Sequence, residues 1–119
     1  ALPHDKVLSV MTRSRAIVMP SVCRETFGLV AYEAMIAAGL PCIVSDVGDA
    51  ASFVRSKGLG EVFSAGNAES LSAAMVNMLD PDVYSRYRGA VEKADFSCLE
   101  KTAYVERLIG IYDQLMAKL

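Results

Sequence analysis

The apolar positions of the chain follow two patterns, short uninterrupted runs and stripes at helical spacing. Apolar runs lie in the segments 16–19, 41–45 and 61–63, and each is bounded by Pro, Gly or a polar loop. A short run of this kind is typical of a strand that is buried on both faces, as in a parallel sheet. The pattern therefore predicts three short strands of one parallel sheet.

Helices are predicted before and between these strands. The first covers 6–12 behind a cap at Asp5. The second covers 27–38 and ends at Gly39, and a short third lies around 50–55. The predicted buried face of the first helix contains Val7, Val10 and Met11. Because strands and helices alternate, the sequence indicates an α/β fold.

The remainder of the chain, 67–119, is predicted to be a helical cluster. Asn67 caps its first helix, and Asp80 followed by Pro81 begins its second. The predicted buried stripe of the first of these helices contains Leu71, Ala74, Met75, Met78 and Leu79.

The last helix is predicted to begin with a capping box formed by Ser97 and Glu100. It is long and apolar on one side. The residues of this apolar face are Val105, Leu108, Ile109, Tyr112, Leu115, Met116 and Leu119.

The 119 residues suffice for one domain or part of one. A doubly wound nucleotide-binding domain has about six strands in two halves, with its ligand at the carboxyl ends of the strands. We therefore interpret 1–119 as a single partial domain, half of a doubly wound Rossmann-like domain. It has about three parallel strands, flanking helices and a C-terminal helical cluster.

Composition narrows the function classes. Hydrophobic residues make up 53% of the chain and charged residues 22%, which fits a globular core and excludes disorder as the main state. The net charge of −2 provides no broad cationic surface, so we expect no nucleic-acid partner. The longest apolar runs, such as 40–44, are far shorter than the roughly 20 residues of a transmembrane helix, and we expect none.

The cysteines indicate a reducing compartment. Cys23, Cys42 and Cys98 are odd in number and widely spaced, which fits free thiols better than a disulfide framework or a zinc site. We expect a cytoplasmic protein, and a peripheral membrane association of the longer protein stays open. The first residues have neither an initiator Met nor a secretion leader, so we expect a processed end or a chain that starts within a longer protein.

Candidate chemistry concentrates where the first strand passes through a polar loop into a helix. The first N–H groups of a helix lack intrahelical partners, and its positive dipole end favours phosphate oxygens. Gly28 lets a ligand approach the backbone closely. Glu25 in the loop and Glu33 in the helix are suited to hydroxyl groups of a sugar and a ribose.

The spacing of these glutamates has no specificity by itself. Two other pairs are separated by eight positions, Glu61 with Glu69 and Glu92 with Glu100, and exposed glutamate is the norm. The setting of Glu25 and Glu33 at a strand, loop and helix junction distinguishes them from the other pairs.

In this setting the sequence resembles the C-terminal, nucleotide-sugar-binding domain of retaining glycosyltransferases of group 1, which have the two-domain GT-B fold. The resemblance covers nearly the whole chain and keeps the order and separations of the family. Its motifs are Pro20-Ser21, Glu25-Thr26-Phe27-Gly28, Glu33-Ala34-Met35, Ala38-Gly39-Leu40-Pro41, Ser45-Asp46-Val47-Gly48, Gly66-Asn67-Ala68-Glu69-Ser70-Leu71 and Phe96-Ser97.

The resemblance implies roles at a donor site. Glu25 would contact the transferred sugar as the catalytic residue, and Glu33 would bind the nucleotide ribose. Thr26 lies between them in the substrate-binding segment. The backbone N–H groups of Phe27, Gly28 and Leu29 would meet the sugar hydroxyls and the diphosphate. The implied reaction is hexosyl transfer from a nucleotide-diphosphate sugar, without a cofactor and without an essential metal.

The chain also departs from the family pattern. Asp49 stands where the family usually has a second glycine, and Ser52 stands where it has a glutamate. The basic residues for the diphosphate, the base-recognising segment and the N-terminal acceptor domain all lie outside this chain. Arg24 could supply one cation, but it suits an ion pair with Glu25 or solvation equally. We therefore expect a glycosyltransferase fragment that is inactive alone.

Other chemistries find less support. His4 is the only histidine and lies at the start of the chain, which disfavours a Ser-His or Cys-His pair. Asp46 and Asp49 could hold a divalent cation, but acids in such a turn more often bond the local backbone. A receiver-like signalling module would need paired acids after the first strand, where Pro20 and Ser21 stand.

The alternative function is a non-enzymatic α/β module for self-association or assembly. Without upstream strands, the strand at 16–19 would expose an apolar edge. The apolar face of the last helix would also be left uncovered. We therefore expect a homo-oligomer, formed by edge pairing or by exchange of this helix.

Overall fold

The computed structural model describes residues 1–24 and 28–119 and contains one sheet of three parallel strands in the order β1-β2-β3. β1 pairs with β2, with Val18 opposite Ile43, and β2 pairs with β3, with Val44 opposite Val62. The three predicted strands are therefore confirmed. They are β1 (Ile17–Met19), β2 (Cys42–Ser45) and β3 (Gly60–Phe63).

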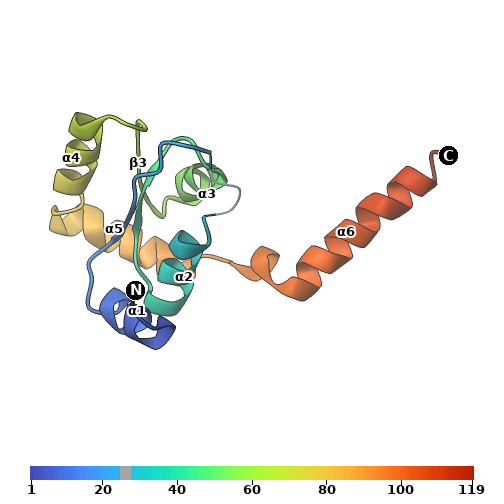
Figure 1. Cartoon of the computed structure of the whole chain (residues 1–119), viewed down its shortest axis with the longest axis horizontal. Coiled ribbons are helices and arrows are strands. Elements are labelled where there is room, and N and C mark those ends of the chain that lie inside the picture. The colour runs from blue at the N-terminus through green and yellow to red at the C-terminus, as the bar shows by residue number, and fades with distance from the viewer. Residues whose placement is uncertain (25–27) are drawn as a thin grey trace.

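The described part of the chain also contains six α-helices and one short 3₁₀ helix, and the last α-helix projects away from the sheet (Figure 1). The order of strand, helix and strand is that of a doubly wound α/β fold. The helices are α1 (His4–Met11), α2 (Leu29–Ala38), α3 (Asp49–Lys57), α4 (Ala68–Asn77), α5 (Pro81–Lys93), η1 (Ser97–Leu99) and α6 (Lys101–Met116).

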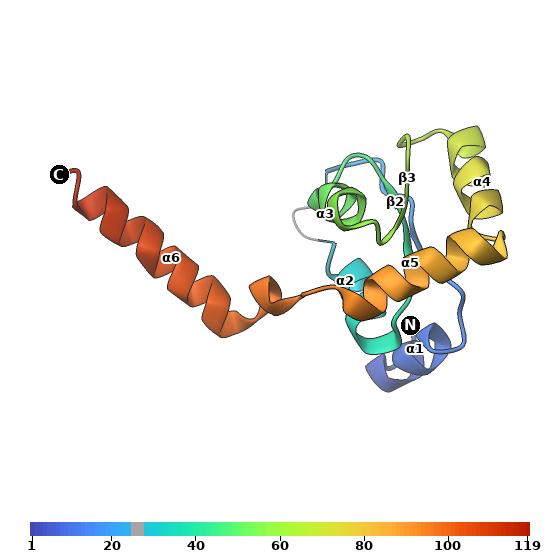
Figure 2. The ribbon, with the colours of Figure 1, turned by 180° about the vertical axis from the view of Figure 1, so that it is seen from behind.

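The side chains of β2 divide the core between the two faces of the sheet. Cys42 and Val44 point to the face that α2 and α3 cover, and the end of α5 joins them there through Val91. Ile43 points to the opposite face and packs with Phe63 and with α4. Figure 2 shows α5 running past the sheet toward α4. All residues of β2 are buried, as expected for the central strand of a parallel sheet.

Aromatic rings connect the helices of the first face. Tyr32 of α2 meets Phe53 of α3 edge to face at a centroid distance of 5.2 Å, and Phe53 lies 5.9 Å from Phe96. Aromatic pairs at these distances contribute about 0.5–1.5 kcal/mol beyond the area they bury. The segment that leads to α6 is therefore anchored to the body of the fold through Phe96.

Several predicted helix ends are confirmed by their caps. The Asn67 side chain accepts a hydrogen bond from the N–H of Ser70 at 2.9 Å. Asp80 accepts hydrogen bonds from the N–H groups of Asp82 and Val83. Gly39 ends α2 with φ 63°, in the left-handed region where a residue without Cβ is favoured.

Two predicted caps are wrong. α1 begins one residue before Asp5 and is preceded by Pro3 with no side-chain cap, so Asp5 lies inside the first turn. The capping box of the last helix is absent, because Ser97 begins η1 and α6 starts only at Lys101. The N–H of Ser97 instead donates to Asp95 at 2.9 Å, and this bond takes up the donor that the box required.

The predicted apolar faces of α1 and α4 are only partly buried. In α1, Met11 is buried and Val10 is exposed. In α4, Ala74 is buried and Met75 is exposed. α1 packs against α2 through Met11, and α4 packs against the sheet through Ala74, so the other apolar residues of both stripes stay at the surface.

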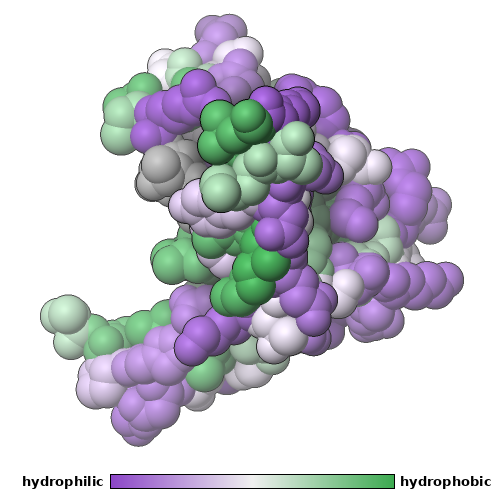
Figure 3. All heavy atoms as spheres, turned by 90° about the vertical axis from the view of Figure 1, so that its right-hand side faces the viewer, coloured by the Kyte–Doolittle hydropathy of each residue, from purple (hydrophilic) through white to green (hydrophobic). Residues whose placement is uncertain are grey.

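α6 projects away from the rest of the molecule, which is elongated with principal extents of 54 × 32 × 31 Å (Figure 1). None of its residues is buried. From the side toward which α6 projects, apolar side chains lie at the surface among hydrophilic ones (Figure 3). The predicted apolar face of the helix is therefore uncovered, and its exposed residues include Val105, Leu108, Ile109, Tyr112, Leu115 and Met116.

Candidate functional site

A small pocket of about 10 Å³, which is room for about one water molecule, lies where the carboxyl ends of β1 and β2 meet the first residues of α2 and α3. In a doubly wound sheet this edge is where ligands bind. Two helices thus begin at one pocket, and both direct their positive dipole ends toward it. Its described lining residues are Met19, Ser21, Gly28, Val44, Ser45, Gly48, Asp49 and Ala50.

Gly28 forms the corner of this pocket at the start of α2. It has φ 60° and ψ 45°, a left-handed conformation that residues with a Cβ rarely adopt. Its carbonyl accepts a hydrogen bond from the N–H of Ala31 at 3.0 Å, and this bond closes the first turn of α2. Leu29, the first residue of α2, is 65% exposed and leaves the helix start open to solvent.

The structure brings some of the predicted site residues together and leaves others outside its description. Gly28 and Leu29 lie at the pocket and at the helix start beside it. Glu33 lies on the exposed side of α2, over one turn further along, with its Oε1 3.9 Å from His4 Nε2 of α1. The remaining predicted residues, Glu25, Thr26 and Phe27, lie outside the described residues.

The acids that follow β2 have separate tasks. The Oδ1 of Asp46 accepts the N–H of Ala65 at 3.0 Å and so connects the ends of β2 and β3. The Oδ1 of Asp49 lies 3.7 Å from Arg24 Nη2, across the mouth of the pocket from the loop after β1. Within residues 1–24 and 28–119, no group of three His, Cys, Asp or Glu side chains is arranged to hold a metal ion.

Ser45 is a pocket residue that the sequence analysis did not select. It is 5% exposed and ends the buried strand β2 at the pocket wall. A polar residue at the end of an apolar run is its only signal in the sequence. This signal would have identified Ser45, because carboxyl ends of parallel strands are the usual ligand edge.

Burial changes the acidity of two groups beneath the site. The pKa of the Tyr32 hydroxyl is raised by burial and, to a smaller extent, by the charges of Cys98 and Asp49. Burial alone raises the pKa of the Cys42 thiol to about 12. Cys42 donates to the carbonyl of Ala31 at 3.8 Å, so it is a neutral core residue without nucleophilic character.

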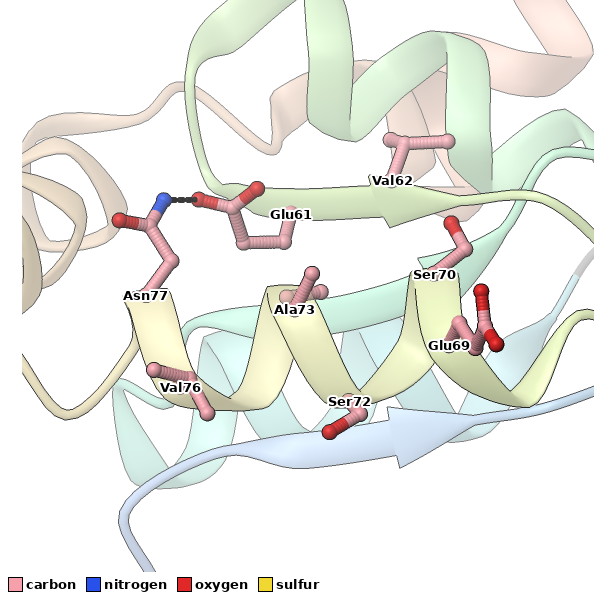
Figure 4. A pocket seen from close by; sticks show the side chains of 9 residues that line it. Glu61, Val62, Glu69, Ser70, Ser72, Ala73, Val76 and Asn77 are labelled. Atoms are coloured by element: carbon pink, nitrogen blue, oxygen red, sulfur yellow. Dashed lines mark hydrogen bonds between the residues drawn. The ribbon is translucent and has the colours of Figure 1, made fainter.

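A second groove, of about 840 Å³, lies between β3 and α4 (Figure 4). Its acid, Glu61, accepts hydrogen bonds from the amide of Asn77 and from the hydroxyl of Tyr87. These bonds tie β3 to α4 and α5, which gives Glu61 a structural role rather than the solvated one expected for it. The groove follows the side of the sheet and not the carboxyl ends of the strands.

Comparison with known proteins assigns the chain to a family. Residues 1–94 match the family model described as glycosyl transferases group 1, which is most of the 119 residues. The chain belongs to the group 1 glycosyltransferases. The predicted resemblance is thereby confirmed, and the pocket described above is a feature of a group 1 glycosyltransferase domain.

A solved structure supports the fold of this glycosyltransferase chain. Sucrose-phosphate synthase from Thermosynechococcus elongatus is similar over 99% of the chain, with a TM-score of 0.69 and 28% sequence identity. The α/β arrangement therefore matches part of a Rossmann-like domain of the GT-B fold. The chain spans 29% of the length of that synthase. None of the curated proteins matches the chain.

The described helices include none that is long and apolar enough to cross a membrane.

Proposed function

We infer that this chain forms part of the donor site of a retaining glycosyltransferase that transfers a hexosyl group from a nucleotide-diphosphate sugar. The observation that carries the proposal is the pocket at the carboxyl ends of β1 and β2, at which both α2 and α3 begin. Open N–H groups and two positive dipole ends favour phosphate oxygens at this place.

Within this proposal Glu25 contacts the transferred sugar as the catalytic residue and Glu33 accepts hydrogen bonds from the ribose diol. The partial exposure of Glu33 supports its role, because 46% of its side chain is accessible and its ion-pair partner among the described residues is the exposed His4. An exposed pair of this kind is weak, so a ribose can replace His4 at the carboxylate.

The segment from Thr26 to Leu29 would hold the sugar and the diphosphate through Thr26 and through the backbone N–H groups of Phe27, Gly28 and Leu29. The left-handed backbone of Gly28 supports this assignment. A residue without a side chain at this corner permits close approach of the phosphates. Fixed N–H groups also stabilise the charge that develops on the leaving diphosphate.

The chain is proposed to be inactive alone. Transfer with retention needs the donor and the acceptor oxygen held together in a cleft from which water is excluded. The pocket opens to solvent beside exposed residues such as Leu29 and Arg24. Measurable sugar transfer by the purified chain of 119 residues would contradict this part of the proposal.

The donor site is tested by nucleotide binding to two matched variants. Glu33→Ala should lower the affinity for nucleoside diphosphates, because the carboxylate that binds the ribose diol is lost. We expect a decrease of about tenfold, the usual effect of a hydrogen bond to a charged group. Glu106→Ala is the control, because Glu106 is an exposed glutamate in the middle of α6. Calorimetric titration that finds equal affinities in both variants would refute the donor-site proposal.

Self-association is a second candidate function, and the uncovered apolar face of α6 favours it. Leu108 and Leu115 lie on this face and are 37% and 55% exposed. Contiguous apolar patches of this kind commonly mark interaction surfaces. Sedimentation at micromolar concentration should detect a dimer, and Leu108→Lys with Leu115→Lys should abolish it. Gln114→Lys on the polar side of α6 is the matched control, and a monomer in the unmodified chain would refute the proposal.

A further inference from the structure

Asp49 is the only charged side chain among the described residues that line the pocket. The rest of that lining consists of apolar side chains, serines and glycines. A carboxylate at this position repels any anion that enters the pocket. The pocket has room for only about one water molecule, so a phosphate would bind at its mouth, beside the starts of α2 and α3. The one charge of the lining has the wrong sign for that ligand.

Arg24 compensates for this charge from the opposite rim. Its Nη2 lies 3.7 Å from the Oδ1 of Asp49, and the two side chains are 83% and 63% exposed. A guanidinium group has five N–H donors and binds phosphate through two of them in parallel. An exposed ion pair contributes only about 0–1 kcal/mol, so Arg24 can exchange one anion for another.

Other charged groups close to this rim have different partners. The carboxylate of Asp46 accepts the N–H of Ala65 and is directed toward the end of β3. Arg55 lies in the last turn of α3 and lines a separate cavity with Asp46 and Gly48. Arg24 is therefore the cation that the described structure holds at the mouth of the pocket.

We propose that Arg24 is a phosphate-binding residue of this pocket and that Asp49 is a competing anion, which holds Arg24 at the rim until a diphosphate displaces it. The inference rests on the proposed donor site and adds a specificity element to it. An anionic ligand such as a diphosphate can take Arg24 from Asp49, whereas a neutral free sugar leaves the ion pair intact.

The test uses inorganic pyrophosphate as the probe and NMR of the full chain, with the amide signals of Gly28, Gly48 and Ala50 as readout. Arg24→Gln should weaken pyrophosphate binding about tenfold, because a charge-assisted hydrogen bond is lost. Asp49→Asn should strengthen it about two- to fivefold, because the competing anion is removed. In the Arg24→Gln background the gain from Asp49→Asn should shrink, because no ion pair remains to be broken.

Matched controls separate the pair from a general effect of net charge. Arg107→Gln removes one exposed cation from α6, and Asp82→Asn removes one acid from the first turn of α5. Both should leave pyrophosphate affinity unchanged within twofold. The inference is overturned if Arg24→Gln behaves like Arg107→Gln, if Asp49→Asn fails to strengthen binding, or if the unmodified chain shows no shifts at the pocket.

Failure of this inference is distinguishable from failure of the proposed donor site. Pyrophosphate has no ribose, so Glu33→Ala should leave its binding unchanged while weakening that of nucleoside diphosphates. If pyrophosphate binding ignores Arg24 and nucleotide binding still depends on Glu33, only the role of Arg24 and Asp49 is wrong. If Glu33→Ala affects neither ligand, the donor-site proposal itself fails.

Discussion

Two apolar helices of this chain, α2 and α6, differ in burial: α2 is buried along one side, and α6 is exposed. α2 packs between the sheet and its neighbours and buries Ala31, Tyr32, Ala34 and Met35. α6 is longer and carries an apolar face over its whole length, but it buries nothing. Both helices show the pattern that predicts burial.

The difference shows that an apolar helix face favours packing against a partner but does not show that the partner is present in the same chain. α2 finds its partners within the chain, because β1 and β2 lie directly beside it in sequence and in space. α6 leaves the body after Phe96 and extends away from it (Figure 2). Stability should therefore depend on the body, and association should depend on α6.

The largest expected loss of stability is at Gly60, where the strands of the body approach most closely. A Cβ at Gly60 would lie 1.9 Å from the carbonyl oxygen of Cys42. Gly60→Ala should lower the free energy of unfolding by about 3 kcal/mol or more, because the backbones of β2 and β3 must separate. Urea denaturation measures the loss. Gly89→Ala in α5 is the control for loss of a glycine, since no atom lies within 4 Å of a Cβ there and its φ is not left-handed.

A pair of methionines compares the two helices directly. Met35 of α2 is 2% exposed and Met116 of α6 is 67% exposed. Met35→Ala should cost about 2–5 kcal/mol of unfolding free energy, because it leaves a cavity. Met116→Ala should stay within about 0.5 kcal/mol at low protein concentration. Equal losses in thermal unfolding would show that α6 is packed as α2 is, against the structure described here.

A pair of glycines compares the same two helices, with smaller expected changes in the free energy of unfolding. Gly28 has φ 60° at the start of α2, so Gly28→Ala should cost about 1–2 kcal/mol through backbone strain. Gly110 lies inside α6 with nothing within 4 Å of a Cβ. Gly110→Ala should therefore raise the helicity of α6 and stabilise it by up to about 1 kcal/mol. Circular dichroism and denaturation of the two variants should show opposite signs.

The smallest expected effect is a pH dependence at the junction between the two regions. Hydrogen bonds from the Ser97 side chain and backbone N–H lower the pKa of Asp95. A lowered pKa means that this carboxylate stabilises η1 above the unfolded value of about 3.9 and loses this effect as pH falls through the folded value. Carboxyl ¹³C titration should place Asp95 below its ordinary pKa. Ser97→Ala should move it back upward, and no difference between the two would contradict this assignment.

The sheet could be predicted from the sequence because its strands are short apolar runs with clear breaks. The order of strand and helix then follows from the rules for parallel sheets. For α6 the sequence predicted only that its apolar face would be uncovered, because an amphipathic pattern does not identify the partner that would cover it. The capping box of the last helix was mispredicted for a local reason, since Asp95 competes with it for the N–H of Ser97. The cap at Asp5 was wrong because α1 begins one residue earlier, at His4.

The sequence predicted residues of the candidate site only where they belong to a family motif. Gly28 and Leu29 follow from the glutamate and glycine motif of group 1, and the structure puts them at the pocket and the adjoining helix start. Ser45 could have been identified from its place at the carboxyl end of an apolar run, whereas the ion pair of Arg24 with Asp49 joins residues far apart in sequence. Such contacts depend on how two loops end at one sheet edge, which no local pattern encodes.

The central claim is that the edge of the sheet at β1 and β2 binds a nucleotide-diphosphate sugar. Chemical-shift mapping of the chain with a nucleoside diphosphate tests it most directly. The account predicts shifts at Gly28, Leu29, Gly48 and Ala50, with ribose contacts at Glu33. Shifts confined to the groove of Glu61, Ser70 and Asn77 between β3 and α4 would contradict it.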